Sequence, residues 1–464
     1  MSENELPSYG NSTVFQKING FLTTPLYIGM IMLLTLLSNL FGIELWVYSI
    51  FVLICLYLCI YGDNLLPLLP ILIACYIAPS KQNNPGKNPD SVFLTGAGSL
   101  WLICLASLAA VALIYRVIRD RKKFFRLRRK LLPSLLLLAA TYFTAGIGSN
   151  GYTENAGSSL VFAAANAGAL LLPYLLLSDS FAGSERKDYL AWTGFGIGCV
   201  LLGQIAFIFL TGSVIQGGAI ERNAIYTGWG MYNNIGALLA MMIPFPFYLA
   251  TTYRRGWLGT LVSSVFLIGV LFTCSRASIL CGCGIYFACV VLTLYYTPNS
   301  RANTLALMLF MGILCGLLLV FSRPLLSLFE PLLDKGLDPS NRDTIYADGL
   351  RLFSKYPIFG GSFFSTEYTP WGWSTVKEFT QFLPPRWHNT FVQMLASCGI
   401  VGLLAYLIHR LQTVLFLLRY RTPEKIFTYA SLLVLLACSL FDCHFFNLGP
   451  TLFYSAALAF AEYH

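Results

Sequence analysis

Charged residues are scarce in this chain of 464 residues, in which Asp, Glu, Lys and Arg together fill 11% of the positions. That fraction, beside 56% hydrophobic residues, excludes both an ordinary water-soluble protein and a disordered one. The sequence also lacks a Walker loop, an HExxH helix, a CxxC pair and a dinucleotide-binding glycine motif. A DxD-type acidic motif is missing from the predicted outer loops, which argues against a reaction that depends on a divalent metal. We therefore expect no cofactor.

Two other absences concern processing and cross-linking. The 13 cysteines lie mostly within apolar runs, as Cys281 and Cys289 do, and their spacing matches neither a metal site nor a disulfide framework. A cleavable signal peptide is not recognised, because the first apolar run begins near Pro25 and no small-residue cleavage site follows. We expect insertion into the membrane through the first spans.

Long uncharged runs dominate the sequence and predict an all-α polytopic membrane protein with about 12 to 14 transmembrane helices. The third run is the weakest, because it is short and interrupted by Pro67 and Pro70. The expected spans are Pro25–Phe41, Leu45–Tyr61, Leu65–Ala78, Ala97–Tyr115, Leu131–Ile147, Gly157–Ser178, Tyr189–Gly212, Gly230–Tyr253, Trp257–Ser275, Ala277–Thr297, Asn303–Ser322, Asn389–Ile408, Ile426–Phe441 and Phe445–Ala461.

Lysine and arginine predict the orientation. The run from Arg116 to Lys130 carries nine positive charges and one aspartate, so we place it in the cytoplasm. The net charge of +9 thus follows a membrane rule and does not indicate nucleic-acid binding. Alternation of the spans puts four other basic clusters on the same side, at 186–187, 254–255, 301 and 419–421. The predicted organisation is a cytoplasmic segment 1–24, spans 1 to 11 in 25–322, an outer loop 323–388 and spans 12 to 14 in 389–464, with both termini cytoplasmic.

The outer loop is rich in aromatic residues, and its seven positive and seven negative charges balance. A capping pattern at 340–343, followed by apolar residues at helical spacing, predicts an amphipathic helix on the outer membrane surface that ends before Pro357. The turn from Thr369 to Trp373 presents two indoles, which suit sugar faces but also anchor loops at lipid headgroups.

Two residues at the ends of predicted spans are the main candidates for chemistry. His388, one of only four histidines, follows Arg386 and Trp387 at the mouth of a span, and an imidazole titrates near neutral pH. It is also compatible with a helix cap or a packing role. Arg276 is the single charge between Trp257 and Ser300, at the hairpin joining two spans. Its guanidinium suits phosphate oxygens, although an arginine there can also extend to the interface.

Weaker candidates lie in the other outer segments. Arg222 follows Glu221, for which the alternative role is that of an ion-pair neighbour, and Arg342 precedes the loop helix. Arg386 is placed to pair with a phosphate or with lipid headgroups. Asp442 is placed to orient His444, but most such pairs are structural.

The order of these elements resembles the O-antigen ligase and polymerase superfamily, which includes lipopolysaccharide O-antigen ligases, Wzy-type polysaccharide polymerases and some protein O-oligosaccharyltransferases. The superfamily pattern is His-[Asn/Ser/Gln], nine residues, Gly, two residues, Gly. This chain matches it with His388, Asn389, Gly399 and Gly402. The matching elements, which span about 212–407, are Ser275-Arg276, Arg342-Asp343, Tyr356-Pro357-Ile358-Phe359-Gly360-Gly361, His388-Asn389 and Gly399-Ile400-Val401-Gly402.

The resemblance implies a glycosyltransferase fold of the C type in a bacterial cytoplasmic membrane, with the catalytic loop outside. Such enzymes move a glycan from a polyprenyl (undecaprenyl) diphosphate carrier to a hydroxyl acceptor in surface-polysaccharide assembly, with inversion and without a metal. By this resemblance His388 is the general base and Arg276 stabilises the leaving diphosphate. The expected substrate-binding residues are Arg222, Arg342, Arg386, Trp387 and Asn389. A flippase and a chain-length regulator are the expected protein partners.

Two alternatives stay open from the sequence. The ligases often continue the motif with Thr-Gly, whereas this chain has Leu403-Leu404, which favours a polymerase over a ligase. A transporter or lipid-linked oligosaccharide flippase would also have many spans. That alternative predicts charges buried near mid-membrane and an internal helix repeat, neither of which the sequence reveals.

Overall fold

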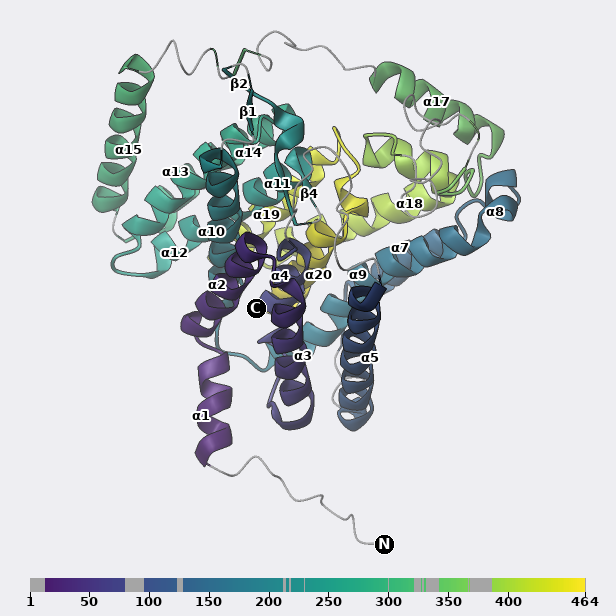
Figure 1. The fold of residues 1–464 in the computed structure, drawn as a ribbon, viewed down its shortest axis with the longest axis horizontal. Coiled ribbons are helices and arrows are strands. Elements are labelled where there is room, and N and C mark those ends of the chain that lie inside the picture. Colours follow the sequence, from purple (N-terminus) through teal and green to yellow (C-terminus); the bar gives the residue numbers. More distant parts are fainter. Residues whose placement is uncertain are drawn as a thin grey trace, which may run out of the picture.

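The computed structural model describes residues 13–79, 96–122, 128–211, 214–216, 218–228, 230–298, 300–320, 327, 329–330, 342–365, 367 and 386–463. In these residues the regular structure is almost wholly helical, and the two small sheets each pair strands of two residues (Figure 1). The predicted all-α membrane fold is therefore confirmed. The predicted turn from Thr369 to Trp373 lies outside the described residues.

The described residues before 211 form helices as their regular structure. These helices are α1 (Thr13–Leu22), α2 (Pro25–Phe41), α3 (Glu44–Tyr61), α4 (Leu68–Ile77), α5 (Gly96–Arg119), α7 (Leu132–Phe143), α8 (Asn150–Glu154), α9 (Ala156–Ala182) and α10 (Tyr189–Leu210). Local sequence sets the ends of α2: Pro25 occupies its first turn, Thr24 caps it, and Gly42 ends it in a left-handed conformation.

The C-terminal part adds short strands before its helices. They are β1 (Ile215–Gln216) paired with β2 (Ala219–Ile220), η2 (Arg222–Ala224), β3 (Tyr226–Thr227) paired with β4 (Gly230–Met231), α11 (Tyr232–Met242), α12 (Pro244–Thr252), α13 (Trp257–Phe272), α14 (Arg276–Tyr296), α15 (Ser300–Val320), α17 (Arg342–Lys355), α18 (Thr390–Arg419), α19 (Pro423–Cys438), η3 (His444–Phe446) and α20 (Leu448–Tyr463). The helix predicted before Pro357 is confirmed as α17.

A helix is present at each predicted span, but many are short. Within the described residues, seven helices are long and apolar enough to cross a membrane, or eight if α1 and α2, which meet at a bend of 68°, form one span. Four shorter apolar stretches, in α4, α7, α13 and α15, have 10–17 residues. The candidate spans agree with an all-α polytopic membrane protein, and the expected number of 12 to 14 spans stays a prediction.

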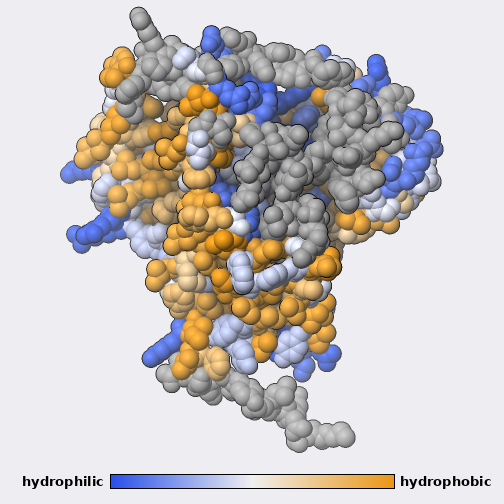
Figure 2. Space-filling model, viewed as in Figure 1, coloured by the Kyte–Doolittle hydropathy of each residue, from blue (hydrophilic) through white to orange (hydrophobic). Residues whose placement is uncertain are grey.

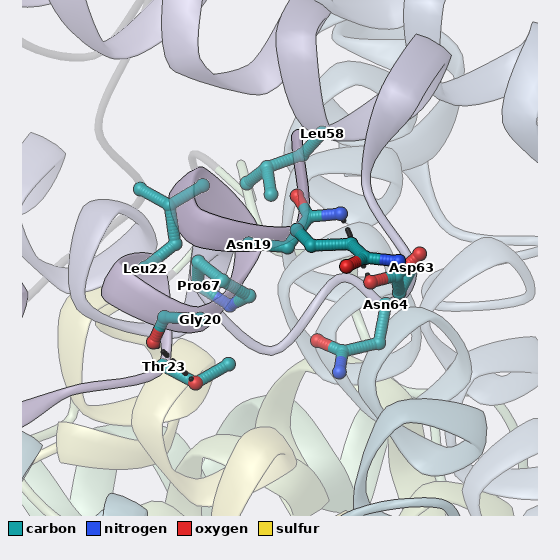
Figure 3. Close-up of a pocket in the computed structure, with 9 residues that line it drawn as sticks. Asn19, Gly20, Leu22, Thr23, Leu58, Asp63, Asn64 and Pro67 are labelled. Atoms are coloured by element: carbon teal, nitrogen blue, oxygen red, sulfur yellow. Dashed lines mark hydrogen bonds between the residues drawn. The ribbon is translucent and has the colours of Figure 1, made fainter. Parts of the chain in front are cut away.

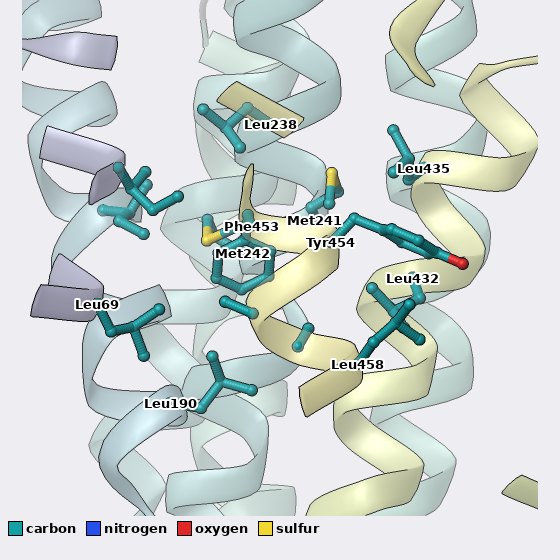
Figure 4. Close-up of a cluster of buried hydrophobic side chains, with 14 of the residues drawn as sticks. Leu69, Leu190, Leu238, Met241, Met242, Leu432, Leu435, Phe453, Tyr454 and Leu458 are labelled. Atoms are coloured by element: carbon teal, nitrogen blue, oxygen red, sulfur yellow. The ribbon is translucent and has the colours of Figure 1, made fainter. Parts of the chain in front are cut away.

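The centre of the molecule is the broken helix α11–α12. In its most apolar stretch 89% of the residues are buried, whereas in that of α5 only 11% are buried. The α11–α12 helix is therefore surrounded by protein, and α5 presents most of its surface outward. Side chains of α4, α10, α11, α19 and α20 meet in one apolar cluster around α11–α12 (Figure 4). On the face seen in Figure 2, hydrophobic residues form a continuous surface through the middle of the molecule, and hydrophilic residues lie around its periphery.

Three of the five basic segments predicted to be cytoplasmic lie close together. Lys130 donates a hydrogen bond to the Tyr420 hydroxyl over 3.0 Å, and Lys187 lies 3.8 Å from a carboxylate oxygen of Glu424. Three of the basic segments are thus adjacent, as the predicted topology requires. Which side of a membrane these segments face stays a prediction.

Helix α18 is broken at Gly399, whose φ of 68° and ψ of −164° are not helical. The rings of Phe391 and Tyr406 lie 5.5 Å apart, although a continuous helix would separate these positions by about 22 Å. The chain therefore reverses at Gly399, into a first limb 390–398 and a second limb 400–419. The predicted span Asn389–Ile408 is wrong, because the first limb is only about 13 Å long and the second, about 30 Å long, has the length of a crossing.

The segment Pro357–Ser362 fills the break in α18. Backbone hydrogen bonds run from Gly361 N to the carbonyl of Ala396 and from Ile400 N to the carbonyl of Pro357, over 2.7 and 2.9 Å. A Cβ on Gly399 would lie 2.3 Å from the carbonyl oxygen of Ile358. Only glycine accommodates both this contact and the positive φ, which gives the glycine of the sequence motif a structural cause.

We predict that Gly399→Ala destabilises the protein by about 1–3 kcal/mol, because the substitution adds a clash to an unfavourable backbone conformation. Thermal unfolding in detergent measures the effect. Gly284→Ala is the matched control, since a Cβ there meets nothing within 4 Å. Equal unfolding temperatures for both variants would contradict this account of the break.

Candidate functional site

A pocket of about 160 Å³ brings together segments that are far apart in the sequence. The turn after β2, the starts of α11, α14 and α17, the residue two positions before α18, and the α19–α20 connection all contribute to it. The lining residues are Arg222, Tyr232, Asn233, Arg276, Ala277, Arg342, Ile345, His388, Phe441, Asp442 and His444. Both predicted catalytic residues and two of the predicted binding residues therefore line the same space.

Arg276 is the first residue of α14, directly after a tight turn. Cys274 has a φ of 53° in that turn, and the hydroxyls of Ser275 and Ser278 lie 2.8 Å apart. A Cβ on Gly236 of α11 would lie 2.7 Å from the hydroxyl of Thr273, so α11 packs closely on the turn. This packing holds the start of α14, and with it Arg276, at the pocket.

Arg222 enters the pocket from the turn η2. Its guanidinium carbon lies 5.2 Å from the centroid of the Tyr232 ring, which is within the range of a cation–π contact. The Glu221 carboxylate accepts a hydrogen bond from the backbone of Asn223 over 3.1 Å. In the described part of the chain no ion pair joins Glu221 to Arg222, because the carboxylate caps the turn.

Arg342 begins α17, which packs on the first limb of α18. A Cβ on Gly349 would come within 2.7 Å of Val392 and 3.1 Å of Trp387, so the two helices are in close contact. At its far end α17 leads into the segment that fills the break in α18. Arg342 and His388 are thus placed by the same helix pair.

His388 is held in a left-handed conformation, with a φ of 48°. The Tyr346 hydroxyl donates a hydrogen bond to its carbonyl oxygen over 3.1 Å. The next two residues are tied to the end of α19, because Thr390 N donates to the Ser439 carbonyl and the Asn389 amide donates to the Leu440 carbonyl. These bonds fix the backbone of His388 beside the α19–α20 connection.

Asp442 is the partner of His388. Its Oδ1 lies 3.3 Å from His388 Nδ1, and the side chains are 8% and 32% exposed, so the carboxylate is covered while the imidazole is accessible. Oδ1 accepts a hydrogen bond from Cys443 N, and Oδ2 accepts one from Asn233. Burial by itself raises the pKa of Asp442, but the contact with His388 and the nearby charge of Arg386 hold that pKa well below its usual range. The carboxylate is therefore ionised.

His444 is a second imidazole in the lining. Burial lowers its pKa, and nearby Arg386 adds to this effect, so the imidazole is neutral at pH 7. Sequence reasoning had not selected Asp442 or His444 as site residues. The Asp442-Cys443-His444 pattern was the one available signal, and it does not distinguish a site from a structural turn.

The pocket strongly favours anions. Three arginines and one ionised aspartate together give a formal charge of +2. The helices α11, α14, α17 and α18 also begin at or next to the pocket, so the positive ends of their dipoles face it. This arrangement suits a ligand with several negative charges, such as a diphosphate.

Three predicted binding residues do not line the pocket. Trp387 is 2% exposed and packs with Leu352 and Ala396 between α17 and α18, so its expected contact with substrate is not supported. The Asn389 side chain caps α18, accepting from Phe391 N and Val392 N. Arg386 acts on the site through its charge near Asp442. Trp387 lies outside the pocket because it packs between helices, and Asn389 lies outside it because it caps α18. The sequence motif alone does not reveal these roles.

A larger pocket, of about 320 Å³, lies between α1, the end of α3 and the connection to α4 (Figure 3). Asn19 donates a hydrogen bond to Asp63 there over 2.9 Å. Its lining includes no arginine, lysine or histidine and none of the predicted site residues. The smaller, basic pocket is therefore the candidate site.

Comparison with known proteins agrees with this choice. Residues 261–407 match a family model described as O-antigen ligase. The matched range contains Arg276, Arg342 and His388 and the break at Gly399, whereas Arg222 and Asp442 lie outside it. The comparison with curated proteins finds no match. The resemblance predicted from the motifs is confirmed over the matched range.

We predict that inorganic pyrophosphate raises the unfolding temperature of the purified protein. A ligand at about 100 times its Kd stabilises the folded state by about 2.7 kcal/mol. Arg276→Gln should weaken this stabilisation, whereas Arg301→Gln, which removes an exposed charge at the start of α15, should preserve it. An equal loss in both variants would show that pyrophosphate binds elsewhere.

Proposed function

We propose that the protein is a membrane glycosyltransferase, because residues 261–407 match a family model described as O-antigen ligase. In this proposal it transfers a glycan from a polyprenyl diphosphate carrier to a hydroxyl acceptor during surface-polysaccharide assembly. The observation that supports it best is the convergence of three arginines and a His–Asp pair on one pocket. The enzyme would work at the outer face of a bacterial cytoplasmic membrane.

The arginines would stabilise the negative charge that develops on the leaving group in this reaction. When the bond between the anomeric carbon and the diphosphate oxygen breaks, the electron pair stays on the departing diphosphate. Arg222, Arg276 and Arg342 would stabilise that charge, assisted by the starts of α14 and α17. Fixed guanidinium groups can supply the charge that a metal ion supplies in other transferases, so we propose a metal-independent reaction.

His388 would act as the general base. The acceptor oxygen attacks the anomeric carbon from the face opposite the diphosphate, and His388 takes the hydroxyl proton as the new bond forms. A single displacement of this kind inverts the anomeric centre. The ionised Asp442 would hold Nδ1 protonated, leaving Nε2 free to accept the proton, and would stabilise the imidazolium that results.

Polymerase and ligase differ in the acceptor, which is a second carrier-linked glycan or a different molecule. We favour a polymerase because Leu403-Leu404 replaces the Thr-Gly of many ligases. Leu404 is 51% exposed on the second limb of α18 and neither leucine lines the pocket, so this difference does not touch the reacting groups. A ligase is the second candidate, and the products formed from a defined donor separate the two.

A transporter was the alternative from another class, and one expectation about it was wrong. No charge near mid-membrane was recognised in the sequence, yet Arg410 lies near the middle of the second limb of α18. The error came from placing that span at Asn389–Ile408. The family match and the pocket chemistry still favour a transferase, because a transporter requires no general base beside a diphosphate site.

We predict that His388→Ala and Arg276→Ala abolish glycan transfer from a polyprenyl diphosphate-linked donor, whereas EDTA leaves wild-type transfer unchanged. The first variant lacks the base and the second lacks charge stabilisation of the leaving group. Transfer is measured with purified protein by the change in product mobility. Full activity of either folded variant would remove that residue from its proposed role, and loss of activity in EDTA would overturn metal independence.

We predict that Asp442→Asn lowers kcat by about 10- to 1,000-fold and moves the acidic limb of the pH–rate profile to lower pH. Without the carboxylate the imidazolium of His388 is less stable, so it loses its proton at lower pH. Asp348→Asn is the matched control, because Asp348 pairs with Arg351 on the surface of α17. An unchanged profile in Asp442→Asn would refute the His–Asp contact as a functional pair.

A further inference from the structure

Arg410 is a charged residue in the middle of a predicted membrane crossing. It is near the middle of the second limb of α18, which has the length of a membrane crossing. Its Nε and Nη2 atoms are buried and have no hydrogen-bond acceptor, and no ion pair joins it to a carboxylate in the described ranges. Charges at such depth are costly and usually serve a function.

Aromatic rings, and not a carboxylate, stabilise the positive charge of Arg410. The guanidinium carbon of Arg410 lies 4.9 Å from the ring centroid of Tyr406, and 4.7 Å from those of both Phe445 and Tyr454. These distances are typical of cation–π contacts. Because helix side chains lean towards the helix N-terminus, the Arg410 side chain extends towards the break at Gly399.

The neighbouring residue, His409, fixes one of these rings. Its Nε2 lies 2.7 Å from the Tyr454 hydroxyl, and its Nδ1 lies 2.9 Å from the Ser134 hydroxyl. Tyr454 is drawn with its hydroxyl pointing away from the central apolar cluster (Figure 4). The aromatic cage around Arg410 is thus anchored to both α7 and α20.

Two rings of the cage connect it to the candidate site. Phe445 follows His444, which lines the pocket, and is three residues after Asp442. The Tyr406 ring lies 5.3 Å from that of Phe445 and 5.5 Å from that of Phe391, three residues after His388. The cage therefore contacts both segments whose relative position sets the distance between His388 and Asp442.

We infer that Arg410 is a positioning residue. Its cation–π contacts with Tyr406 and Phe445 hold the segment that carries His388 and the segment that carries Asp442 in the positions that bring these two side chains into contact. The inference rests on the proposed transferase function. Arg410 touches neither the pocket nor a reacting group, so it acts on catalysis only through the geometry of the pair. A guanidinium suits this task because it binds several rings at once through its faces.

The charged and titratable groups around both residues determine which measurement is informative. Those near Arg410 are His409, Tyr142, Tyr406, Tyr429 and Tyr454, and those near His388 are Asp442, His444, Arg222, Arg276, Arg342 and Arg386. Asp442 is the carboxylate in this set, so the protonation of His388 reports its contact with Asp442. Phe445→Leu loosens the cage without changing any charge, which makes it the cleanest variant for pH measurements.

The experiment measures glycan transfer by Arg410→Gln, Arg410→Lys, Phe445→Leu and Arg419→Gln in the full chain. Arg410→Gln should lower kcat about 10- to 100-fold with KM for the donor nearly unchanged, because small misplacements near reacting groups have effects of this size. Arg410→Lys, which keeps a cation among the rings, should recover much of the loss. Phe445→Leu should move the acidic limb of the pH–rate profile to lower pH.

Arg419→Gln is the matched control, since Arg419 lies on the same helix, 5.6 Å from the ring of Tyr420, at the far end from the pocket. It should behave as wild type. A folded Arg410→Gln variant with wild-type kcat would overturn the inference, as would an Arg410→Lys variant no better than Arg410→Gln. If Arg410→Gln does not fold, Phe445→Leu decides: a wild-type pH profile overturns the inference and a shifted one supports it.

A second measurement separates failure of this inference from failure of the proposed function. Diethyl pyrocarbonate modification of His388, followed by mass spectrometry across pH, reports imidazole protonation without any substrate. The half-exposed His388 should be modified at lower pH in Phe445→Leu than in wild type. If wild type transfers no glycan but this shift is present, the function is wrong and the positioning role stands. If transfer occurs and the shift is absent, the positioning role is wrong.

Discussion

The architecture of the candidate site depends on the hydrogen bonds that form where α18 breaks at Gly399. The segment from Pro357 to Ser362 satisfies backbone groups on both sides of the break, which an uninterrupted helix would have satisfied internally. In an apolar environment no water is present to form hydrogen bonds with such groups. The break in α18 is therefore stable only because the segment Pro357–Ser362 supplies these hydrogen bonds. The junction fixes α17 beside the first limb of α18, and thereby places Arg342 and His388.

The N-terminal helices hold the same junction from the other side. Gly146 N donates a hydrogen bond to the Phe359 carbonyl over 2.7 Å, and the hydroxyls of Ser159 and Ser362 lie 2.7 Å apart. Residues before 210 therefore do more than provide membrane helices, because α7 to α9 support the segment that fills the break. The pocket consequently combines a rigid backbone with an excess of positive charge, an arrangement that requires no reorganisation when an anion binds.

Much of this could be predicted from the sequence. Uncharged runs predicted a helix at each span, and four of the proposed site residues, His388, Arg276, Arg222 and Arg342, line one pocket. Three of the five basic segments that were predicted to share one side of the membrane are adjacent. The motif did not separate reacting side chains from supporting ones. Trp387 and Asn389 follow the same pattern as His388, but the first packs between helices and the second caps α18.

The sequence by itself determined the fold class and the chemistry available, because both depend on local composition: apolar runs form membrane helices, and imidazole and guanidinium groups carry fixed chemical properties. Only the tertiary structure decided which groups meet. The reversal at Gly399 moved the predicted crossing from 389–408 to 400–419, and so placed Arg410 at the middle of that crossing. The contact between His388 and Asp442 likewise joins residues on either side of α18 and α19, a juxtaposition set by packing and hydrogen bonds between distant segments that no local pattern encodes.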